Sequence, residues 1–185
     1  MKSTTLLAIL ALTAVSCSIN GLTNDYGKLN EEERKLIVPL TDFNNLDSSL
    51  IYTLNGSQLR AELQKHPKAL VYGFTNGCTS EYCRPLIVYE NYAKEKGYRL
   101  FLVMNGFGNL SKTLEQPHNG QLFAIDGDYY KTSYRSTYIR YFENEVVGKP
   151  QKQKGLNGSL LFLENGRLVK ALNDLPEFAT TSIVR

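Results

Sequence analysis

The stretch ALVYGFTNGCTSEYC, residues 69–83, decides how the rest of the chain is interpreted. Residues 69–75 are a short apolar run, which predicts a buried strand. Cys78 and Cys83 follow this run, and residues 86–96 have the pattern of a helix. The chain therefore carries a pair of thiols at a predicted junction between a strand and a helix.

The spacing of the two cysteines constrains the structure around them. Residues five apart in a regular α-helix have Cα atoms about 8 Å apart, whereas a disulfide requires Cα atoms within about 7 Å. Proline is best tolerated in the first turn of a helix, and Pro85 follows the pair. If Cys78 and Cys83 are bonded, we expect residues 76–83 to form a loop and the helix to begin near Arg84 and Pro85.

Predicted strands and helices alternate along the remaining chain. Further strands are predicted at residues 50–54, 98–104 and 121–125, and helices at residues 57–65, 111–116 and 129–147, besides a short helix from residue 31 that Pro39 ends. Residues 159–163 and 167–172 flank Asn165-Gly166, which predicts a β-hairpin. This order indicates an α/β sandwich, in which a mixed central sheet is flanked by helices and ends in a C-terminal β-hairpin.

The N-terminal residues have the features of an export signal. Lys2 precedes an apolar run from Thr5 to Val15, which is too short to span a bilayer but fits a secretory signal. The run leads into AVSC, residues 14–17, which resembles a bacterial lipobox, where the cysteine is diacylated and becomes the mature N-terminus. We therefore expect lipidation of Cys17. The alternative is an ordinary signal peptide that is cleaved nearby and leaves Cys17 as an odd free thiol.

These observations divide the chain into three parts. We expect a signal peptide at residues 1–16, a lipidated tether at residues 17–30 and one domain at residues 31–185. An exported lipoprotein belongs to the cell envelope, and the expected place is the outer membrane, with the lipid as anchor and the domain facing the periplasm. A disulfide can persist in such a compartment. The net charge of +3, without a long basic run, predicts no nucleic-acid partner.

The predicted order of elements resembles the thioredoxin-like superfamily, and most closely its exported branch of TlpA-like proteins. The resemblance covers residues 50–172. It rests on the strand 69–75 that leads to a cysteine, on the basic residue in Cys83-Arg84, on an extra strand and a long helix before the hairpin, and on the segment 159–166.

The resemblance implies a thioredoxin-like domain that performs thiol–disulfide exchange. By analogy with the family, Cys78 attacks and Cys83 resolves the mixed disulfide. A helix that starts near Arg84 and Pro85 would instead place Cys83 at its N-terminus, so the sequence leaves open which of the two thiols is more acidic. The implied partners are protein thiols or disulfides, together with a redox partner that recycles the pair. No cofactor is expected, and a lone cysteine pair lacks the further ligands of a metal site.

Three departures from the family pattern support an alternative. Four residues separate Cys78 from Cys83, where the family has two. Gly158 stands where the family has a cis-proline before the penultimate strand, and Gly77 replaces the tryptophan before the first cysteine. The alternative is a non-catalytic binding or assembly lipoprotein in which the Cys78–Cys83 disulfide is structural.

Residues 75–83 also resemble the peroxiredoxins of the bacterioferritin-comigratory type, whose pattern is Thr-Pro-Gly-Cys-Thr-x-x-x-Cys. This second resemblance implies peroxidase activity at Cys78. The proline that this family places seven residues before its cysteine is Val71 here. We therefore prefer the thiol–disulfide oxidoreductase to the peroxidase.

Aromatic residues recur along the predicted helix 129–147. Four of them follow one another at helical spacing and would form one stripe: Tyr130, Tyr134, Tyr138 and Tyr141. We expect this stripe to pack on the sheet, and a surface that binds a ligand or partner is the alternative. Three basic residues fall on the other faces, where we expect them to be solvated: Lys131, Arg135 and Arg140.

Overall fold

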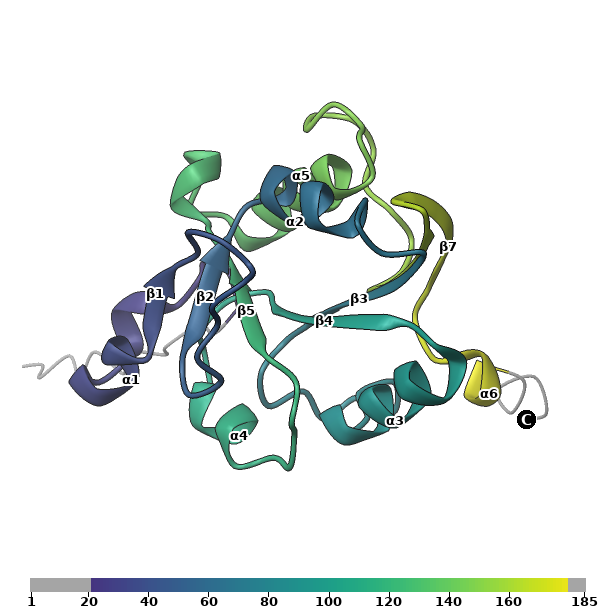
Figure 1. The fold of residues 1–185 in the computed structure, drawn as a ribbon. Coiled ribbons are helices and arrows are strands. Elements are labelled where there is room, and N and C mark those ends of the chain that lie inside the picture. The colour runs from purple at the N-terminus through teal and green to yellow at the C-terminus, as the bar shows by residue number, and fades with distance from the viewer. Residues whose placement is uncertain (1–20, 180–185) are drawn as a thin grey trace, which may run out of the picture.

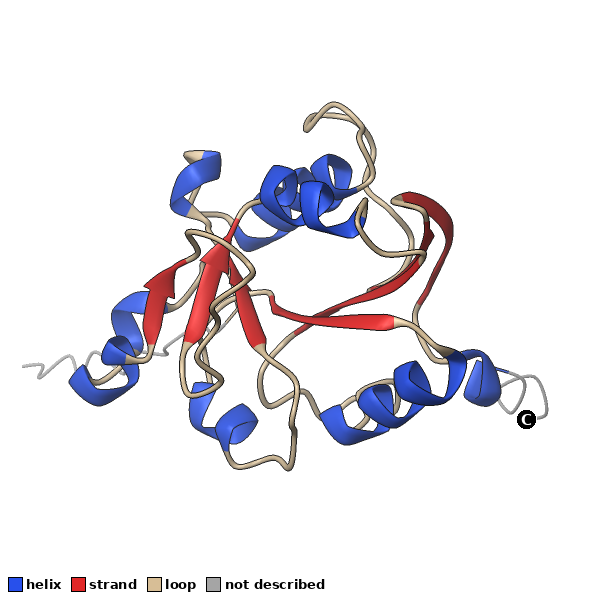
Figure 2. Ribbon diagram, in the orientation of Figure 1, coloured by secondary structure: helices blue, strands red, loops and turns tan. Residues whose placement is uncertain are grey.

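Seven strands form one mixed sheet in the computed structural model, which describes residues 21–179. They are β1 (Ile37–Pro39), β2 (Ile51–Leu54), β3 (Lys68–Phe74), β4 (Arg99–Met104), β5 (Leu122–Ile125), β6 (Leu160–Glu164) and β7 (Arg167–Leu172). Their order is β1-β2-β5-β4-β3-β6-β7, in which the first five are parallel and β6 and β7 are antiparallel to their neighbours (Figure 2). The predicted α/β architecture with a mixed sheet and a C-terminal hairpin is confirmed. The predicted signal peptide and Cys17 lie outside the described residues.

Helices cover both faces of this sheet. They are α1 (Glu31–Lys35), α2 (Gly56–Leu63), α3 (Leu86–Lys96), α4 (Leu110–Leu114), α5 (Arg135–Val146) and α6 (Pro176–Ala179), with 3-10 turns η1 (Tyr26–Lys28) and η2 (Asp128–Tyr130). Figure 1 shows α2 and α5 on one face and α3 and α4 on the other. Side chains alternate between two apolar cores, so that along β3 Leu70 and Tyr72 pack towards α3 while Ala69 and Val71 pack towards α2 and α5.

Local hydrogen bonds confirm several predicted boundaries. Asn30 caps α1, because its Oδ1 accepts from the N–H of Glu33 at 2.8 Å and the Glu33 carboxylate accepts in return from the N–H of Asn30 at 3.0 Å. Gly97 ends α3 with a φ of 72°, in the left-handed region that favours glycine. Asn165 and Gly166 both have positive φ and form the turn between β6 and β7.

The segment after α1 is a strand, although the sequence predicted a helix up to Pro39. α1 ends at Lys35, and Ile37–Pro39 pair in parallel with residues 51–53 as β1. The β-branched side chains of Ile37 and Val38 suit a strand. Pro39 is tolerated because β1 lies at the edge of the sheet, where one row of N–H groups has no partner strand.

The predicted helix at residues 129–147 begins later than expected. Asp126 accepts hydrogen bonds from the N–H groups of Asp128 and Tyr129 at 3.1 and 3.2 Å, which closes the turn η2. Lys131 then takes a left-handed φ of 53°, and α5 starts only at Arg135. The predicted tyrosine stripe is therefore divided.

The tyrosines on either side of this break lie in different surroundings. Tyr138, in α5, is fully buried, and its hydroxyl donates to the carbonyl of Asn105. Tyr130 is buried in η2, where its hydroxyl accepts from the N–H of Gly56 at 2.8 Å. Tyr134 is 65% exposed. Only part of the stripe packs against the rest of the domain.

Arg135 is buried, and the prediction that it is solvated was wrong. Its side chain is 10% exposed and its Nη2 lies 2.9 Å from Oδ2 of Asp25, whose side chain is 1% exposed. Nε of Arg135 donates to the carbonyl of Thr23 at 3.0 Å. Asp25 also pairs with Lys28 at 3.0 Å. Residues 21–30, which the sequence predicted to be a tether, therefore contact the domain through a buried ion pair.

Two glycines let the loop after β4 approach this ion pair. A Cβ on Gly106 would lie 2.8 Å from Nη2 of Arg135, and a Cβ on Gly108 would lie 2.7 Å from Oδ2 of Asp25. Between them, the N–H of Phe107 donates to the carbonyl of Asn24 at 2.7 Å. The Gly-Phe-Gly sequence thus fits a close contact between the N-terminal segment and the sheet.

Candidate functional site

Cys78 and Cys83 form a disulfide in the loop between β3 and α3. Their Cα atoms are 5.9 Å apart. Residues 75–85 are not helical, and α3 begins at Leu86 with Pro85 in the N-cap position. The predicted loop and the predicted helix start are both confirmed. The physical reason is that an intact helix would hold the two Cα atoms too far apart for a disulfide.

The first half of this loop is anchored by a buried amide. Asn76 is 2% exposed, donates from Nδ2 to the carbonyl of Gly106 at 2.9 Å and accepts at Oδ1 from the hydroxyl of Thr113 at 2.7 Å. Gly77 follows with a φ of 63°. Both partners of Asn76 come after β4 in the chain, so the cysteine loop is tied to the next connection of the sheet.

The second half of the loop rests on Tyr89 of α3. The ring of Tyr89 stacks on Tyr72 of β3, with ring centroids 3.9 Å apart. The Tyr89 hydroxyl donates to the carbonyl of Tyr82 at 3.2 Å and accepts from the N–H of Arg84 at 3.5 Å. Burial raises the pKa of the Tyr72 hydroxyl above its ordinary value. Tyr89 therefore supports the backbone on both sides of Cys83.

Arg84, the residue after Cys83, is held by the C-terminal end of the domain. Its Nε and Nη2 donate to the two carboxylate oxygens of Asp174 at 2.9 and 2.6 Å, which forms a bidentate pair. The guanidinium also lies 3.6 Å from the ring centroid of Phe178 in α6. The hydrogen bonds with Asp174 raise the pKa of Arg84. A carboxylate thus balances the positive charge next to Cys83.

The disulfide borders a cavity of about 430 Å³. Both cysteines line it, together with Tyr72, Phe74 and Lys112 among others. Cys78 is exposed, whereas Cys83 is half-buried. A thiol or disulfide of another molecule therefore has easier access to Cys78 than to Cys83.

Gly158 occupies the position before β6 where the sequence analysis noted a glycine in place of the cis-proline of thioredoxin-like proteins. Its φ is 140°, and a Cβ there would lie 2.6 Å from backbone atoms of Leu172 in β7. The carbonyl of the next residue, Ser159, accepts from the N–H of Gly73 in β3 at 2.8 Å. No cis peptide bond is present in residues 21–179. This position therefore holds a trans glycine packed closely on the edge strand.

Sequence reasoning identified the two cysteines but missed the groups that hold them. Asn76 and Tyr89 carry no motif, and their roles depend on partners in other elements. Asp174 is 90 positions from Arg84, and no spacing rule connects them. The one available signal was the position of Asn76 just after the predicted buried strand. A polar amide that is buried at such a position needs hydrogen-bond partners inside the protein.

Comparison of this chain with protein-family models, curated proteins and solved structures gives no match. None of the helices within residues 21–179 has the length and apolar character needed to cross a membrane. In the same part of the chain, no three His, Cys, Asp or Glu side chains are grouped so that they could hold a metal ion. The case for a function therefore rests on the disulfide and its surroundings.

Proposed function

We propose that this protein is a thioredoxin-like lipoprotein of the cell envelope that exchanges thiols and disulfides through Cys78 and Cys83. The position of the disulfide carries the proposal. It spans the loop between the end of β3 and the start of α3, and its more exposed cysteine stands beside a cavity. Cys83 lies next to the N-terminus of α3, and a helix N-terminus lowers the pKa of a nearby thiol, which favours the thiolate that resolves the mixed disulfide.

The topology of the sheet supports the thioredoxin-like part of the proposal. β3, α3 and β4 form a parallel unit with the cysteines in its first connection, and the hairpin of β6 and β7 adds antiparallel strands beside β3. β5 and α5 are inserted between β4 and the hairpin. This agrees with the extra strand and helix on which the TlpA-like resemblance rests.

In the proposed reaction, the reduced protein transfers two electrons to a substrate disulfide. The Cys78 thiolate attacks one substrate sulfur, the substrate S–S bond breaks, and the leaving thiolate takes up a proton. The Cys83 thiolate then attacks Sγ of Cys78, which releases the second substrate thiol and forms the Cys78–Cys83 disulfide. A separate protein dithiol reduces this disulfide and completes the cycle. The exposure of Cys78 supports its assignment as the attacking residue.

A structural disulfide in a binding or assembly lipoprotein is the second candidate, and Gly158 favours it. In members of the family the cis-proline shapes the substrate groove, whereas here a trans glycine packs on Leu172. A disulfide that closes so short a loop contributes about 2 kcal/mol by the chain-entropy relation. On this alternative, the double variant Cys78→Ser/Cys83→Ser keeps its function and loses only that stability.

A redox titration of the cysteine pair separates these two candidates. We expect a potential near about −200 mV or higher for an exchanging pair, whereas a structural bond lies below about −300 mV. The variant Cys83→Ser is also expected to trap mixed disulfides through Cys78, visible on non-reducing gels and released by dithiothreitol. The matched control Cys78→Ser/Cys83→Ser should trap nothing. A low potential without trapped species would contradict the exchange function.

The balance of charge at Arg84 leads to a further prediction. Asp174→Asn leaves the guanidinium unneutralised beside Cys83, and a neighbouring cation stabilises a thiolate. Stabilising the reduced form raises the reduction potential, and we expect a rise of about 30 mV, a tenfold change in the exchange constant. Glutathione titration of the pair measures it. Glu177→Gln removes a carboxylate of α6 that pairs with Lys96 instead of Arg84, and it serves as control. Equal shifts in both variants would contradict the role of Asp174.

The location in the envelope depends on the predicted lipidation of Cys17. We expect Cys17→Ser to move the protein from the membrane fraction to the soluble fraction, because no acyl chain is then attached. The redox potential of the 78–83 pair should stay unchanged, which separates anchoring from exchange. Retention of the variant in the membrane fraction would argue against the lipid anchor.

A further inference from the structure

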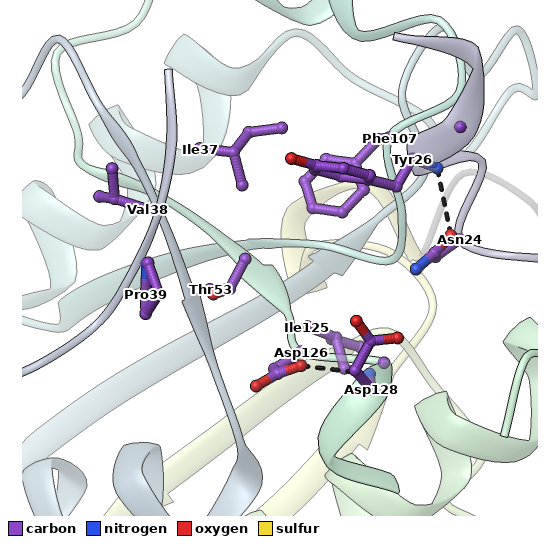
Figure 3. Close-up of a pocket in the computed structure, with 12 residues that line it drawn as sticks. Asn24, Tyr26, Ile37, Val38, Pro39, Thr53, Phe107, Ile125, Asp126 and Asp128 are labelled. Atoms are coloured by element: carbon purple, nitrogen blue, oxygen red, sulfur yellow. Dashed lines mark hydrogen bonds between the residues drawn. The ribbon is translucent and has the colours of Figure 1, made fainter. Parts of the chain in front are cut away.

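A second cavity, of about 570 Å³, lies apart from the cysteines and is larger than theirs. Figure 3 shows the residues that line it. It is formed by β1, by the carboxyl ends of β2 and β5, and by the N-terminal segment at residues 24–27. It shares no lining residue with the cavity beside the disulfide. Ligands of open α/β sheets bind outside the carboxyl ends of the parallel strands. The second cavity therefore lies where ligands commonly bind in this class of fold.

One side of this cavity is aromatic and the other is acidic. Tyr26 and Phe107 pack edge to face with centroids 5.5 Å apart, and apolar side chains of β1 continue this wall. Figure 3 shows Asp126 and Asp128 on the opposite side. Asp126 directly follows β5, and Asp128 begins η2 two residues later. The N–H of Asp126 donates to the carbonyl of Leu54 at 2.9 Å.

The two carboxylates have no counter-ion within residues 21–179. The basic side chains of the N-terminal segment have other partners, and Lys131, which follows η2, is exposed. Lys28 pairs with Asp25 at 3.0 Å, and Arg34 donates to the carbonyl of Gly27 at 3.2 Å while it lies 5.8 Å from the ring centroid of Tyr26. The cavity thus carries negative charge beside an apolar wall.

The polar groups of the cavity are held in place by the protein itself. Oδ1 of Asp126 accepts from the N–H groups of Asp128 and Tyr129, which orients its carboxylate. Oδ1 of Asn24 accepts from the N–H of Tyr26 at 3.1 Å. The backbone of Asn24 is fixed in turn by a hydrogen bond from Phe107. Asp126 and Asn24 are therefore oriented before a ligand binds, which limits the entropy lost on binding, while the Asp128 carboxylate is exposed at the rim.

We propose that this cavity binds an organic cation, an alkylammonium group on an apolar chain, with Asp126 and Asp128 as its counter-ions. The ammonium group neutralises the two carboxylates, and the chain packs on Tyr26, Phe107 and β1. A neutral ligand of the same shape would cover the carboxylates without compensating their charge, which is unfavourable. The proposal does not depend on thiol–disulfide exchange, because the two cavities are separate.

Titration calorimetry of the protein at low ionic strength tests this proposal. The probes are cadaverine, a free diamine, and Nα-acetyl-lysine methylamide, which presents the same ammonium group on a peptide unit. We expect saturable one-to-one binding that weakens with added salt. The double variant Asp126→Asn/Asp128→Asn should bind at least tenfold more weakly, and 1-pentanol, which lacks the charge, should not bind.

The control is Asp42→Asn/Glu164→Gln, which makes the same change in net charge on exposed residues outside the cavity. It should bind like the unmodified protein. In the cavity variant, the amide oxygen introduced at position 126 can still accept the two backbone hydrogen bonds, and a thermal melt verifies the fold. Tighter binding of one probe identifies its source as a free amine or a peptide. The proposal would be overturned if the cavity variant and the control variant bound the probes with equal affinity, or if neither probe showed saturable binding. The variant Cys78→Ser/Cys83→Ser should bind normally whatever the redox function.

Discussion

The free energy of unfolding is expected to fall by about 3 kcal/mol when Arg135 is replaced with alanine. The guanidinium is 10% exposed and pairs with the buried carboxylate of Asp25. Its removal also leaves the carbonyl of Thr23 without its donor. Most of the loss in stability arises because the buried carboxylate of Asp25 no longer has Arg135 as its partner. The ion pair of Asp25 with Lys28, at 3.0 Å, offsets part of this loss. Urea denaturation followed by circular dichroism measures the change.

Two further variants test this explanation. Lys35→Ala removes a cation from an exposed pair with Glu32 and should cost less than about 1 kcal/mol. The double variant Asp25→Asn/Arg135→Met removes both charges and should regain part of the stability lost by Arg135→Ala, since no unpaired charge remains. An effect of Arg135→Ala as small as that of Lys35→Ala would contradict the buried pair.

Asp25 also makes this stabilisation dependent on pH. Burial by itself raises the pKa of Asp25, but hydrogen bonds from Lys28 and the N–H of Gly21, with the attraction of Lys28 and Arg135, outweigh it and lower the pKa. A pKa that is lower in the folded state stabilises the protein above the unfolded-state value of about 3.9, and this contribution is lost as the pH falls through the folded-state value. The loss of stability below about pH 4 should therefore be shallower in Arg135→Ala than in the unmodified protein.

Gly158→Ala is expected to lower the free energy of unfolding by about 2–4 kcal/mol. The backbone at this position has a φ of 140°, where an L side chain is strained. The added Cβ would also lie 2.6 Å from the N and O atoms of Leu172. These are backbone atoms of a paired strand, so they cannot move aside as a flexible side chain would. The melting temperature and the urea midpoint both report the effect.

Two other glycines separate the strain of the backbone from the steric contact. Gly97 has a φ of 72° but no atom near its would-be Cβ, so Gly97→Ala should cost only about 1 kcal/mol. Gly27 has neither a positive φ nor a neighbour within 4 Å, so Gly27→Ala should be nearly neutral. Equal effects at Gly158 and Gly97 would show that the contact with Leu172 contributes nothing.

The cysteine loop could be predicted well because the constraints on it are local. The rise of a helix, the reach of a disulfide and the place of Pro85 together exclude a helix at residues 76–83. The cap at Asn30, the end of α3 at Gly97 and the turn at Asn165-Gly166 are local in the same way. Each of these depends on residues within a few positions along the chain.

The start of α5 and the burial of Arg135 could not be predicted from periodicity. The helical spacing of the tyrosines favoured one continuous helix, whereas the side chain of Asp126 closes a separate turn and Lys131 reverses the sign of φ. Arg135 was assigned to a solvated face of that helix. Its partner Asp25 lies 110 positions away, in a segment whose composition is that of a tether.

The residue pattern along the chain thus predicts the α/β architecture, the antiparallel hairpin and the non-helical loop that holds the cysteine pair. The surroundings of that pair depend on contacts between distant segments: Asp174 against Arg84, Asn76 between two segments after β4, and a glycine packed on β7. Tertiary folding also placed two carboxylates and two aromatic rings around the second cavity. The physical reason is that periodicity, caps and turns act between near neighbours in the chain, whereas the charge and access of a site are set by groups that meet only when distant segments pack.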